Sequence, residues 1–233
     1  MLYLHEVHRV AGRDEDAFET HVDEDWMASL AATGDARLAW HLKLAHGTGR
    51  AYCHVTVTAL RDGNAYENLA RRVQTGDLRA WAAHADTLRH DVEGTLLLPM
   101  AWGPQVTEFD AIPIDAGARS QALFMQDRAW PYAAKLDEYI EAARTHYAPS
   151  LEEHTSRSLL DMVAIFQAAL GAPRRREVLL WQRVVYPERL TGLFTRDLPD
   201  FVKAPGTWMH DALEVRDDWE SQLLRTTKRS PLH

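Results

Sequence analysis

A short motif that occurs twice constrains the fold of this chain more than any other feature of its sequence. The pattern R-x-D-x-E-x-x-L-L begins at Arg89 and begins again at Arg216, an offset of 127 residues. Trp81 and Trp208 keep the same offset. A repeat of this length approaches that of a small domain, whereas solenoid proteins repeat over much shorter segments. The sequence therefore predicts two tandem copies of one fold.

The predicted elements follow the same order in both copies. Residues 2–9 alternate between two faces as a strand does, and the apolar residues from Phe18 to Leu30 are spaced as one stripe of a helix. The other expected strands are 37–45, 51–60, 95–102, 121–128, 157–169 and 176–186, and the other expected helices are 64–73, 76–93, 132–146, 187–197 and 207–224. Residues 159–170 suit a helix as well as a strand, so the pattern there does not decide between the two.

This order is a β-α-β-β-α-β unit, which forms a four-stranded antiparallel sheet with both helices on one face. The other face of the sheet is then apolar and uncovered, and two copies bury it by packing sheet against sheet. We therefore expect an α+β fold in which a ferredoxin-like unit is duplicated and two antiparallel sheets pack face to face as an α/β barrel. The expected boundaries are 1–104 for the first repeat, 105–120 for a linker, 121–226 for the second repeat and 227–233 for a frayed tail.

Composition excludes several classes of function. The 233 residues carry a net charge of −8, which opposes nonspecific binding to nucleic acid or to an anionic membrane. Cys53 is the single cysteine, so an internal disulfide is excluded and a cytoplasmic location is expected. No apolar run is long enough to span a bilayer, and the first residues lack the pattern of a signal peptide. No phosphate-binding glycine loop or nucleophile elbow occurs, so no nucleotide cofactor is predicted.

Four segments of the chain resemble a known family. They are residues 4–9 (LHEVHR), the Trp26-Met27 pair, residues 45–49 (AHGTG) and the closing stretch from Arg216 to Leu224. These segments are similar to the NIPSNAP-like group of the dimeric α/β barrel superfamily. The resemblance implies the duplicated fold and a cavity for small molecules. It leaves the activity open, because the superfamily includes cofactor-free monooxygenases, isomerases, cyclases and haem enzymes.

Histidines in the first copy are the candidate catalytic residues. His54 and His41 are the leading candidates for proton transfer, and His5 is the third, since all three lie on predicted strands. We expect this polar phase of the strands, which also holds Lys43 and Thr56, to line a cavity between the two sheets. The opposite phase, from Leu38 to Leu44 and from Cys53 to Val57, is expected to pack under the helices. A bulge of one residue would exchange the two faces, and the alternative is that these histidines are single, structurally bonded side chains.

The same three histidines define the metal alternative. Converging imidazoles of His5, His41 and His54 could hold a divalent transition metal, although no H-x-H or H-E-x-x-H spacing supports it. No cofactor is otherwise predicted. The residues expected to contact substrate are Tyr3, Thr56, Trp102, Arg128 and Trp181. Glu6 is expected to face the helices and to form a structural ion pair with Arg89 or Arg9.

These observations predict an enzyme that acts on a small aromatic or polyketide-like molecule by cofactor-independent oxygenation, isomerisation or cyclisation. The first alternative is a metal-dependent oxidoreductase that uses the same histidines. The second is a binding or scaffold protein without catalysis. The expected partner is a small-molecule substrate, and the fold is compatible with a homodimer.

Overall fold

The structure, a computed structural model, describes residues 1–103, 108–152, 159–174 and 176–233. The chain divides into two compact units. The first contains residues 1–99, 108–122 and 223–233, and the second contains residues 100–103 and the described part of 123–222. The segment expected as a linker therefore belongs mainly to the first unit.

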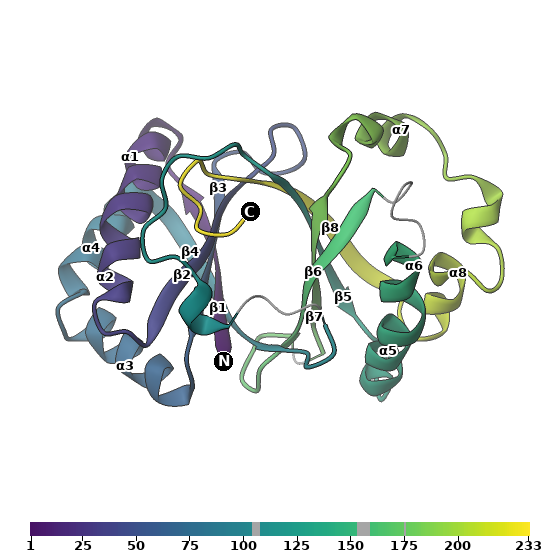
Figure 1. The fold of residues 1–233 in the computed structure, drawn as a ribbon, viewed down its shortest axis with the longest axis horizontal. Helices are drawn as coiled ribbons and strands as arrows, with labels where there is room; N and C mark the ends of the chain where they lie inside the picture. Colours follow the sequence, from purple (N-terminus) through teal and green to yellow (C-terminus); the bar gives the residue numbers. More distant parts are fainter. Residues whose placement is uncertain (104–107, 153–158, 175) are drawn as a thin grey trace. The chain divides into compact units, whose positions relative to one another are not determined.

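The first unit is a four-stranded antiparallel sheet with its helices on one face (Figure 1). Its elements are β1 (Leu2–Val10), α1 (Glu15–Thr20), a π-helical turn (His21–Trp26), α2 (Met27–Ala31), β2 (Ala36–Leu44), β3 (Cys53–Leu60), α3 (Gly63–Gln74), α4 (Arg79–Leu88) and β4 (Arg89–Pro99). The strands lie in the order β4-β1-β3-β2, and all three pairings are antiparallel. The end of β8 (Asp218–Thr226) extends this sheet by pairing Leu42 with Thr226 and Leu44 with Leu224.

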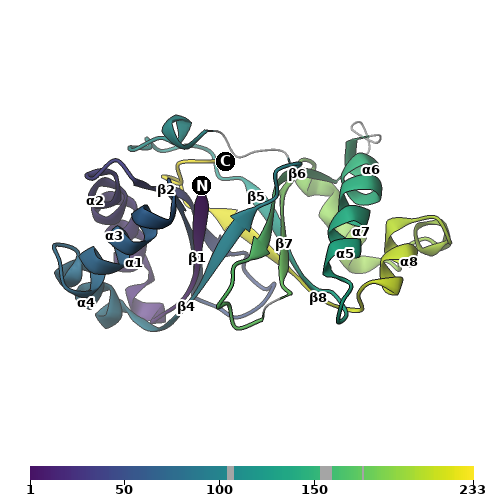
Figure 2. The ribbon, with the colours of Figure 1, turned by 90° about the horizontal axis from the view of Figure 1, so that it is seen from below.

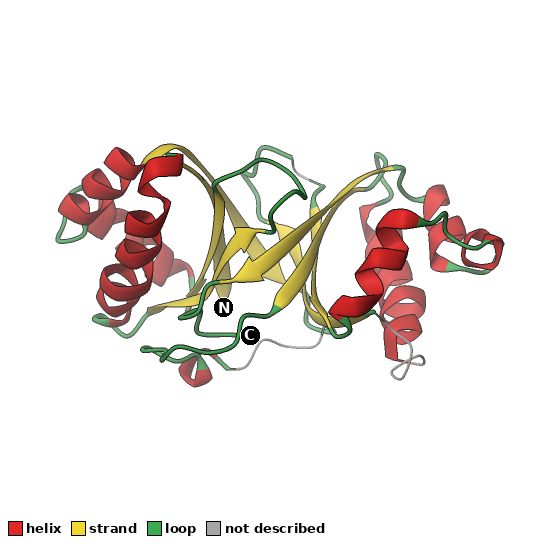
Figure 3. Ribbon diagram, turned by 90° about the horizontal axis from the view of Figure 1, so that it is seen from above, coloured by secondary structure: helices red, strands yellow, loops and turns green. Residues whose placement is uncertain are grey.

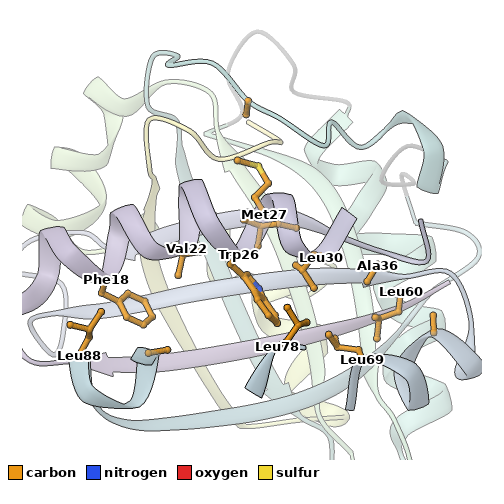
Figure 4. Close-up of a cluster of buried hydrophobic side chains, with 14 of the residues drawn as sticks. Phe18, Val22, Trp26, Met27, Leu30, Ala36, Leu60, Leu69, Leu78 and Leu88 are labelled. Carbon is orange, nitrogen blue, oxygen red and sulfur yellow. The ribbon is translucent and has the colours of Figure 1, made fainter. Parts of the chain in front are cut away.

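Apolar side chains join the helices of the first unit to one face of its sheet. Phe18, Val22, Trp26 and Leu30 point from the predicted helical stripe into the core, as Figure 4 shows. Leu38 and Leu60 meet them from the sheet. Asp62 caps α3, because its carboxylate accepts the backbone N–H of Ala65 at 3.0 Å. The stripe predicted from the sequence is therefore the stripe that the core uses.

The second unit repeats the architecture of the first. Its elements are β5 (Leu123–Trp130), α5 (Leu136–Ala142), a π-helical turn (Ala143–Tyr147), α6 (Ala148–Glu152), β6 (Leu160–Ala168), β7 (Val178–Val184), α7 (Leu190–Thr195), α8 (Trp208–Asp211) and most of β8. Its strand order, β8-β5-β7-β6, matches that of the first unit, and its helices again lie on one face of the sheet (Figure 2 and Figure 3). The predicted fold class, α+β with a duplicated ferredoxin-like unit, is confirmed. The ambiguous segment near residues 159–170 is the strand β6.

The repeated motif lies on strands, and its assignment to helices was wrong. Helix α4 ends at Leu88, and β4 begins at Arg89; in the second copy β8 begins at Asp218. The predicted helices 76–93 and 207–224 are thus too long. Charged residues at every second position of R-x-D-x-E follow the period of a strand, with Asp91 and Glu93 exposed. The motif marks the last strand of each copy.

The last residues of the chain are not frayed. Thr227 and Ser230 are fully buried, and the backbone N–H groups of Thr227 and Leu232 donate to the carbonyls of His41 and Ala39 at 2.9 and 3.0 Å. The tail therefore continues along β2 and satisfies its outer backbone groups. Within the described residues no helix has both the length and the apolar character needed to cross a bilayer.

Candidate functional site

A cavity of about 240 Å³ lies in the first unit, on the face of the sheet that the helices cover. Strands β1, β3 and β4, the π-helical turn, α3 and α4 all contribute to its wall. Apolar side chains from Leu4, Leu69 and Val73 cover part of the wall, and Glu6, His8, Thr56 and Arg89 provide its polar groups. An apolar hollow with a few converging polar groups is the usual form of a small-molecule site.

Two tryptophans form a flat aromatic wall in this cavity. The rings of Trp26 and Trp81 stack at 4.0 Å between centroids, with 21° between their planes. The ring of His21 also stacks on Trp81, at 4.5 Å between centroids and 11° between planes. The indole of Trp81 also donates to the carbonyl of His21 at 3.4 Å. This stack is fixed before any ligand arrives, and it offers a surface suited to a flat ring system.

The polar groups of the cavity form a chain of hydrogen bonds with a defined direction. Arg89 can only donate, and its Nη1 lies 2.8 Å from Nδ1 of His8, so this nitrogen must hold a lone pair. The proton of the imidazole is then on Nε2, which donates to the hydroxyl of Thr56 at 2.9 Å. The hydroxyl of Thr56 in turn bonds to the carboxylate of Glu6. Glu6 is thus the accepting end of the chain.

Burial sets the protonation of these groups. It lowers the pKa of His8 well below its usual value, and the nearby positive charge of Arg89 lowers it further, so His8 is neutral. Burial also raises the pKa of Glu6, against the opposing effects of Arg89 and of the Thr56 hydrogen bond. A carboxylate with a raised pKa is a stronger base than an ordinary one, and Glu6 faces the cavity.

His41 and His54 form a second chain on the same face of the sheet. Nδ1 of His41 lies 2.6 Å from Oδ1 of Asp23, and Nε2 of His41 lies 2.9 Å from Nδ1 of His54. Nε2 of His54 lies 3.5 Å from Oε1 of Glu15, which is 28 % exposed. Both imidazoles are fully buried, and the ring of Phe18 packs against both. The structure therefore joins the two leading candidates from the sequence into one network.

A β-bulge explains why His41 does not lie on the predicted face, whereas His54 and Thr56 lie on a regular stretch of β3 whose phase was assigned to the wrong face. Leu38 pairs with Thr58, but Trp40 pairs with Val57, so Ala39 is an extra residue in β2. Leu38 and His41 consequently share the face under the helices, while Trp40 and the residues of its phase lie on the opposite face. The expectation that His41, His54 and Thr56 line a cavity between the sheets is therefore wrong, since they lie under the helices.

The other predicted residues do not join either chain. On β1, His5 and Tyr3 are buried on the face opposite Glu6 and His8. Trp102 packs in the core of the second unit, and Trp181 is buried there beside Phe124, with ring centroids 5.9 Å apart. Arg128 forms an ion pair with Glu177 at 3.4 Å, again in the second unit. Of the residues expected to contact substrate, Thr56 lines the cavity.

The structure does not bring the proposed metal ligands together. His5 lies on the other face of the sheet, and His41 and His54 bond directly to each other, which leaves no space for an ion between them. Among the described residues, no group of three or more histidine, cysteine, aspartate or glutamate side chains is placed to hold a metal. The residues therefore do not fit the metal alternative.

Three residues of the cavity were not chosen from the sequence as site residues, namely Glu6, His8 and Arg89. The alternation of β1 carried the signal, because Leu2, Leu4, Glu6 and His8 share one face, and the two leucines mark it as the core face. Glu6 was correctly expected to face the helices, but the expected ion pair was wrong: Arg89 pairs with Asp86 and Arg9 pairs with Asp91. The hydrogen bond from Arg89 to His8 had no signal, because it joins residues 81 positions apart.

Comparisons with known proteins inform the fold. No family model matches the chain, and no curated protein matches it. A putative monooxygenase from Lactobacillus acidophilus is similar over 98% of this chain and 97% of its own, with 12% identity and a TM-score of 0.58. An anthrone oxidase-like protein is similar over 99% of this chain and 93% of its own, with 8% identity and a TM-score of 0.62. A NIPSNAP domain protein from Burkholderia xenovorans matches 45% of this chain and 100% of its own, with 18% identity and a TM-score of 0.36.

These likenesses show that the chain has a fold of the dimeric α/β barrel type. They do not establish the NIPSNAP family, because the match to that protein covers less than half of this chain at a low TM-score. The family resemblance seen in the four sequence segments is therefore supported only at the level of the fold.

Proposed function

We propose that this protein is an oxygenase that acts on a flat, anthrone-like aromatic molecule in the cavity of the first unit, with Glu6 as the general base. The observation that carries the proposal is the directed chain from Arg89 through His8 and Thr56, which ends at a carboxylate in an aromatic-walled cavity. Two structures of the same fold, a putative monooxygenase and an anthrone oxidase-like protein, support the reaction class.

The proposed reaction needs dioxygen and a base. Glu6 removes a proton from an activated methylene carbon of the substrate, and the carbanion transfers an electron to dioxygen. Recombination of the two radicals and a proton gives a hydroperoxide. Loss of the second C–H proton breaks the O–O bond and releases water, so that CH₂ and O₂ become C=O and H₂O. Glu6 carries both carbon protons, which is the work of a general base with a raised pKa.

The other groups of the cavity have supporting roles in this proposal. The Trp26–Trp81 stack holds the ring system and excludes water. The guanidinium of Arg89 places positive charge on the wall, where it stabilises negative charge that develops on the substrate. His8 and Thr56 orient the carboxylate of Glu6 and deliver no proton themselves. The partner in this proposal is a small molecule; the homodimer, the cytoplasmic location and the predicted domain boundaries stay predictions.

The test compares two carboxyl-to-amide variants, one in each copy. Glu6→Gln removes the base but keeps the shape of the side chain, and Asp127→Asn makes the same change at the buried acid of the second unit. Purified protein is incubated with anthrone, and oxygen uptake and quinone absorbance are measured together with quenching of tryptophan fluorescence by the ligand. We expect Glu6→Gln to lose at least about 100-fold in kcat with quenching retained, because one general base contributes about 10²–10⁴-fold.

Asp127→Asn is expected to keep the wild-type rate. Equal losses in the two variants would show that the effect is structural, and the role of Glu6 would then be rejected. Quenching of the wild type without oxygen uptake or product would make the first unit a binding module for aromatic molecules instead of an enzyme.

A further inference from the structure

The chain of Asp23, His41, His54 and Glu15 is separate from the groups that the proposed reaction uses. It runs from Asp23, whose side chain is 4% exposed, to Glu15 at the edge of the sheet. Neither imidazole lines the cavity, but His54 is the direct cross-strand partner of His8, and the ring of Phe18 packs against both. The chain therefore lies beside the cavity without opening into it.

The positions of the protons in this chain follow from its geometry. Oδ1 of Asp23 accepts a hydrogen bond from the hydroxyl of Thr227 at 3.3 Å, so it acts as an acceptor toward Nδ1 of His41 as well. The contact with Asp23 places a proton on Nδ1 of His41, and the lone pair of Nε2 in this tautomer accepts from Nδ1 of His54. Neutral His54 then has its lone pair on Nε2.

This last nitrogen is a buried acceptor that faces another acceptor. Nε2 of His54 faces Oε1 of Glu15 at 3.5 Å, a contact longer than an ordinary hydrogen bond. This carboxylate opposes the lowering of the pKa of His54 by burial. Three donor–acceptor contacts link the four groups, and each contact needs one proton. Two imidazoles with one proton each supply only two. One further proton, taken up between His54 and Glu15, completes the chain.

We propose that Asp23, His41 and His54 form a buried proton relay whose acceptor atom, Nε2 of His54, exchanges protons with solvent through Glu15. Asp23 fixes the tautomer of His41, and His41 fixes that of His54, so the acceptor always points toward Glu15. A proton that enters there can move inward by shifting along the two imidazoles toward Asp23.

Charges from each neighbouring element surround the acceptor. Glu15 and Glu19 come from α1, Lys43 comes from β2, and His8 comes from β1. Lys43 bonds to Glu19 at 2.8 Å and lies 3.6 Å from Glu15, so it holds the carboxylate that receives the proton. Arg225 adds a positive charge near Lys43. The two carboxylates favour proton uptake at this end, and the lysine limits it.

The protonation state of the relay also affects the protonation of His8 in the wall of the neighbouring cavity. A proton on His41 or His54 is a positive charge close to His8, and such a charge opposes protonation of His8. This keeps the directed chain to Glu6 intact when the relay takes up a proton. The use of the relay by the reaction rests on the proposed function, whereas the relay itself does not.

The relay is tested by NMR of the full chain with ¹⁵N-labelled histidine, which reports the protonation of each ring nitrogen. At neutral pH we expect His41 and His54 each to be protonated on Nδ1 alone, with His54 Nε2 giving the signal of an unprotonated nitrogen. Exposed His46 is the internal reference. In Asp23→Asn the single tautomers should give way to mixtures in both rings.

Asp25→Asn is the matched control, because it removes another carboxylate of the same turn, which bonds to His21 at 3.1 Å outside the relay. It should leave His41 and His54 unchanged. A second variant, Glu15→Gln, changes only the partly exposed end and should lower the pH at which His54 Nε2 gains its proton by about one unit, a tenfold loss of proton affinity.

Two outcomes would overturn the relay: single tautomers that persist in Asp23→Asn, or an unchanged titration of His54 in Glu15→Gln. Neither result depends on turnover, so failure of the relay is distinguishable from failure of the proposed oxygenase, which Glu6→Gln decides.

Discussion

The two copies place a buried acid at the same position of their first strand, but they surround it differently. A constant offset of 121 residues relates Glu6 to Asp127, His8 to Ala129, Phe18 to Tyr139 and Trp26 to Tyr147. In the second unit, Gln182 donates to Asp127 at 2.9 Å, and the hydroxyl of Tyr147 bonds to Gln182. Protein side chains thus occupy the surroundings of Asp127 and bond to its Oδ2, while its buried Oδ1 has no hydrogen-bond partner among the described residues.

In the first unit the acid faces an unfilled space. Trp26 lacks the hydroxyl that its counterpart Tyr147 has. His8, whose counterpart is Ala129, connects Glu6 to Arg89 through Thr56. Burial raises the pKa of both acids. Burial alone therefore does not make a site. A carboxyl group with a raised pKa is structural where side chains fill its surroundings, as at Asp127, and is available for chemistry where they do not, as at Glu6.

The largest expected effect that separates the copies is the response of stability to acid. Burial lowers the pKa of His54 in the folded chain to about 4, from 6.5. Between these values the unfolded chain binds a proton that the folded chain does not, so stability falls as the pH drops from about 6.5 to 4. His54 contributes up to about 3 kcal/mol of this loss.

Urea unfolding of the wild type and of His54→Gln at several pH values measures this effect. The variant should lose the share of the slope that His54 contributes, while buried His8 keeps its own share, and His46→Gln, at an exposed histidine, should keep the wild-type slope. A slope that is the same in all three proteins would contradict the assignment of His54 as a buried neutral group.

The next effect is expected from making the first copy more like the second at one position. His8→Ala introduces the residue that the second copy has at Ala129 and removes the acceptor of Arg89 and the donor to Thr56. We expect a loss of about 10-fold or more in kcat and about 1–3 kcal/mol of stability, because Arg89 is left without its buried partner. Turnover of anthrone and urea unfolding measure the two quantities. An unchanged kcat would remove His8 from the chain that orients Glu6.

The smallest effect is expected in the second unit. Tyr147→Phe removes the hydroxyl that bonds to Gln182 and should cost about 1 kcal/mol of stability, with no change in the turnover of anthrone. Thermal unfolding and the oxygen-uptake assay check both parts. A loss of turnover similar to that of Glu6→Gln would show, as it would for Asp127→Asn, that turnover follows the structural integrity of the chain and not the base at Glu6.

Much of the fold follows from patterns that the sequence displays directly. The repeat at Arg89 and Arg216 predicts the duplication, and the stripe from Phe18 to Leu30 is the core face of the helices. The strand boundaries at Arg89 and Asp218 were missed because R-x-D-x-E suits both i, i+4 pairs on a helix and alternation on a strand. In that motif the local pattern does not decide between them, whereas pairing with β1 does.

The site was predicted in part, for a different reason. His41 and His54 were chosen together because they lie on neighbouring strands, and the structure places them in hydrogen-bond contact; their role in proton transfer stays a prediction. The face of His41 could not be predicted, because the extra residue in β2 has no mark in the sequence: alanine suits a regular strand position as well as a bulge. The face of His54 was misassigned because the apolar phase of β3 was expected to lie under the helices, whereas His54 pairs with His8 on that face. The partner of His8 was also hidden, since the helices α3 and α4 and the strand β3 separate it from Arg89 in the chain.

The extra residue at Ala39 makes the face on which His41 lies depend on one irregularity in β2. The carbonyl of Ala39 accepts the backbone N–H of Leu232, so the closing segment of the chain holds the irregularity in place. Regular pairing of the same sequence would turn Trp40 toward the helices and His41 away from them, whereas the bulge keeps His41 beside Thr56. The backbone of β2, and not the presence of histidine alone, therefore decides whether this imidazole reaches the helix face. Among relatives of this fold, the phase of the second strand is a better guide to shared chemistry than the presence of histidine in it.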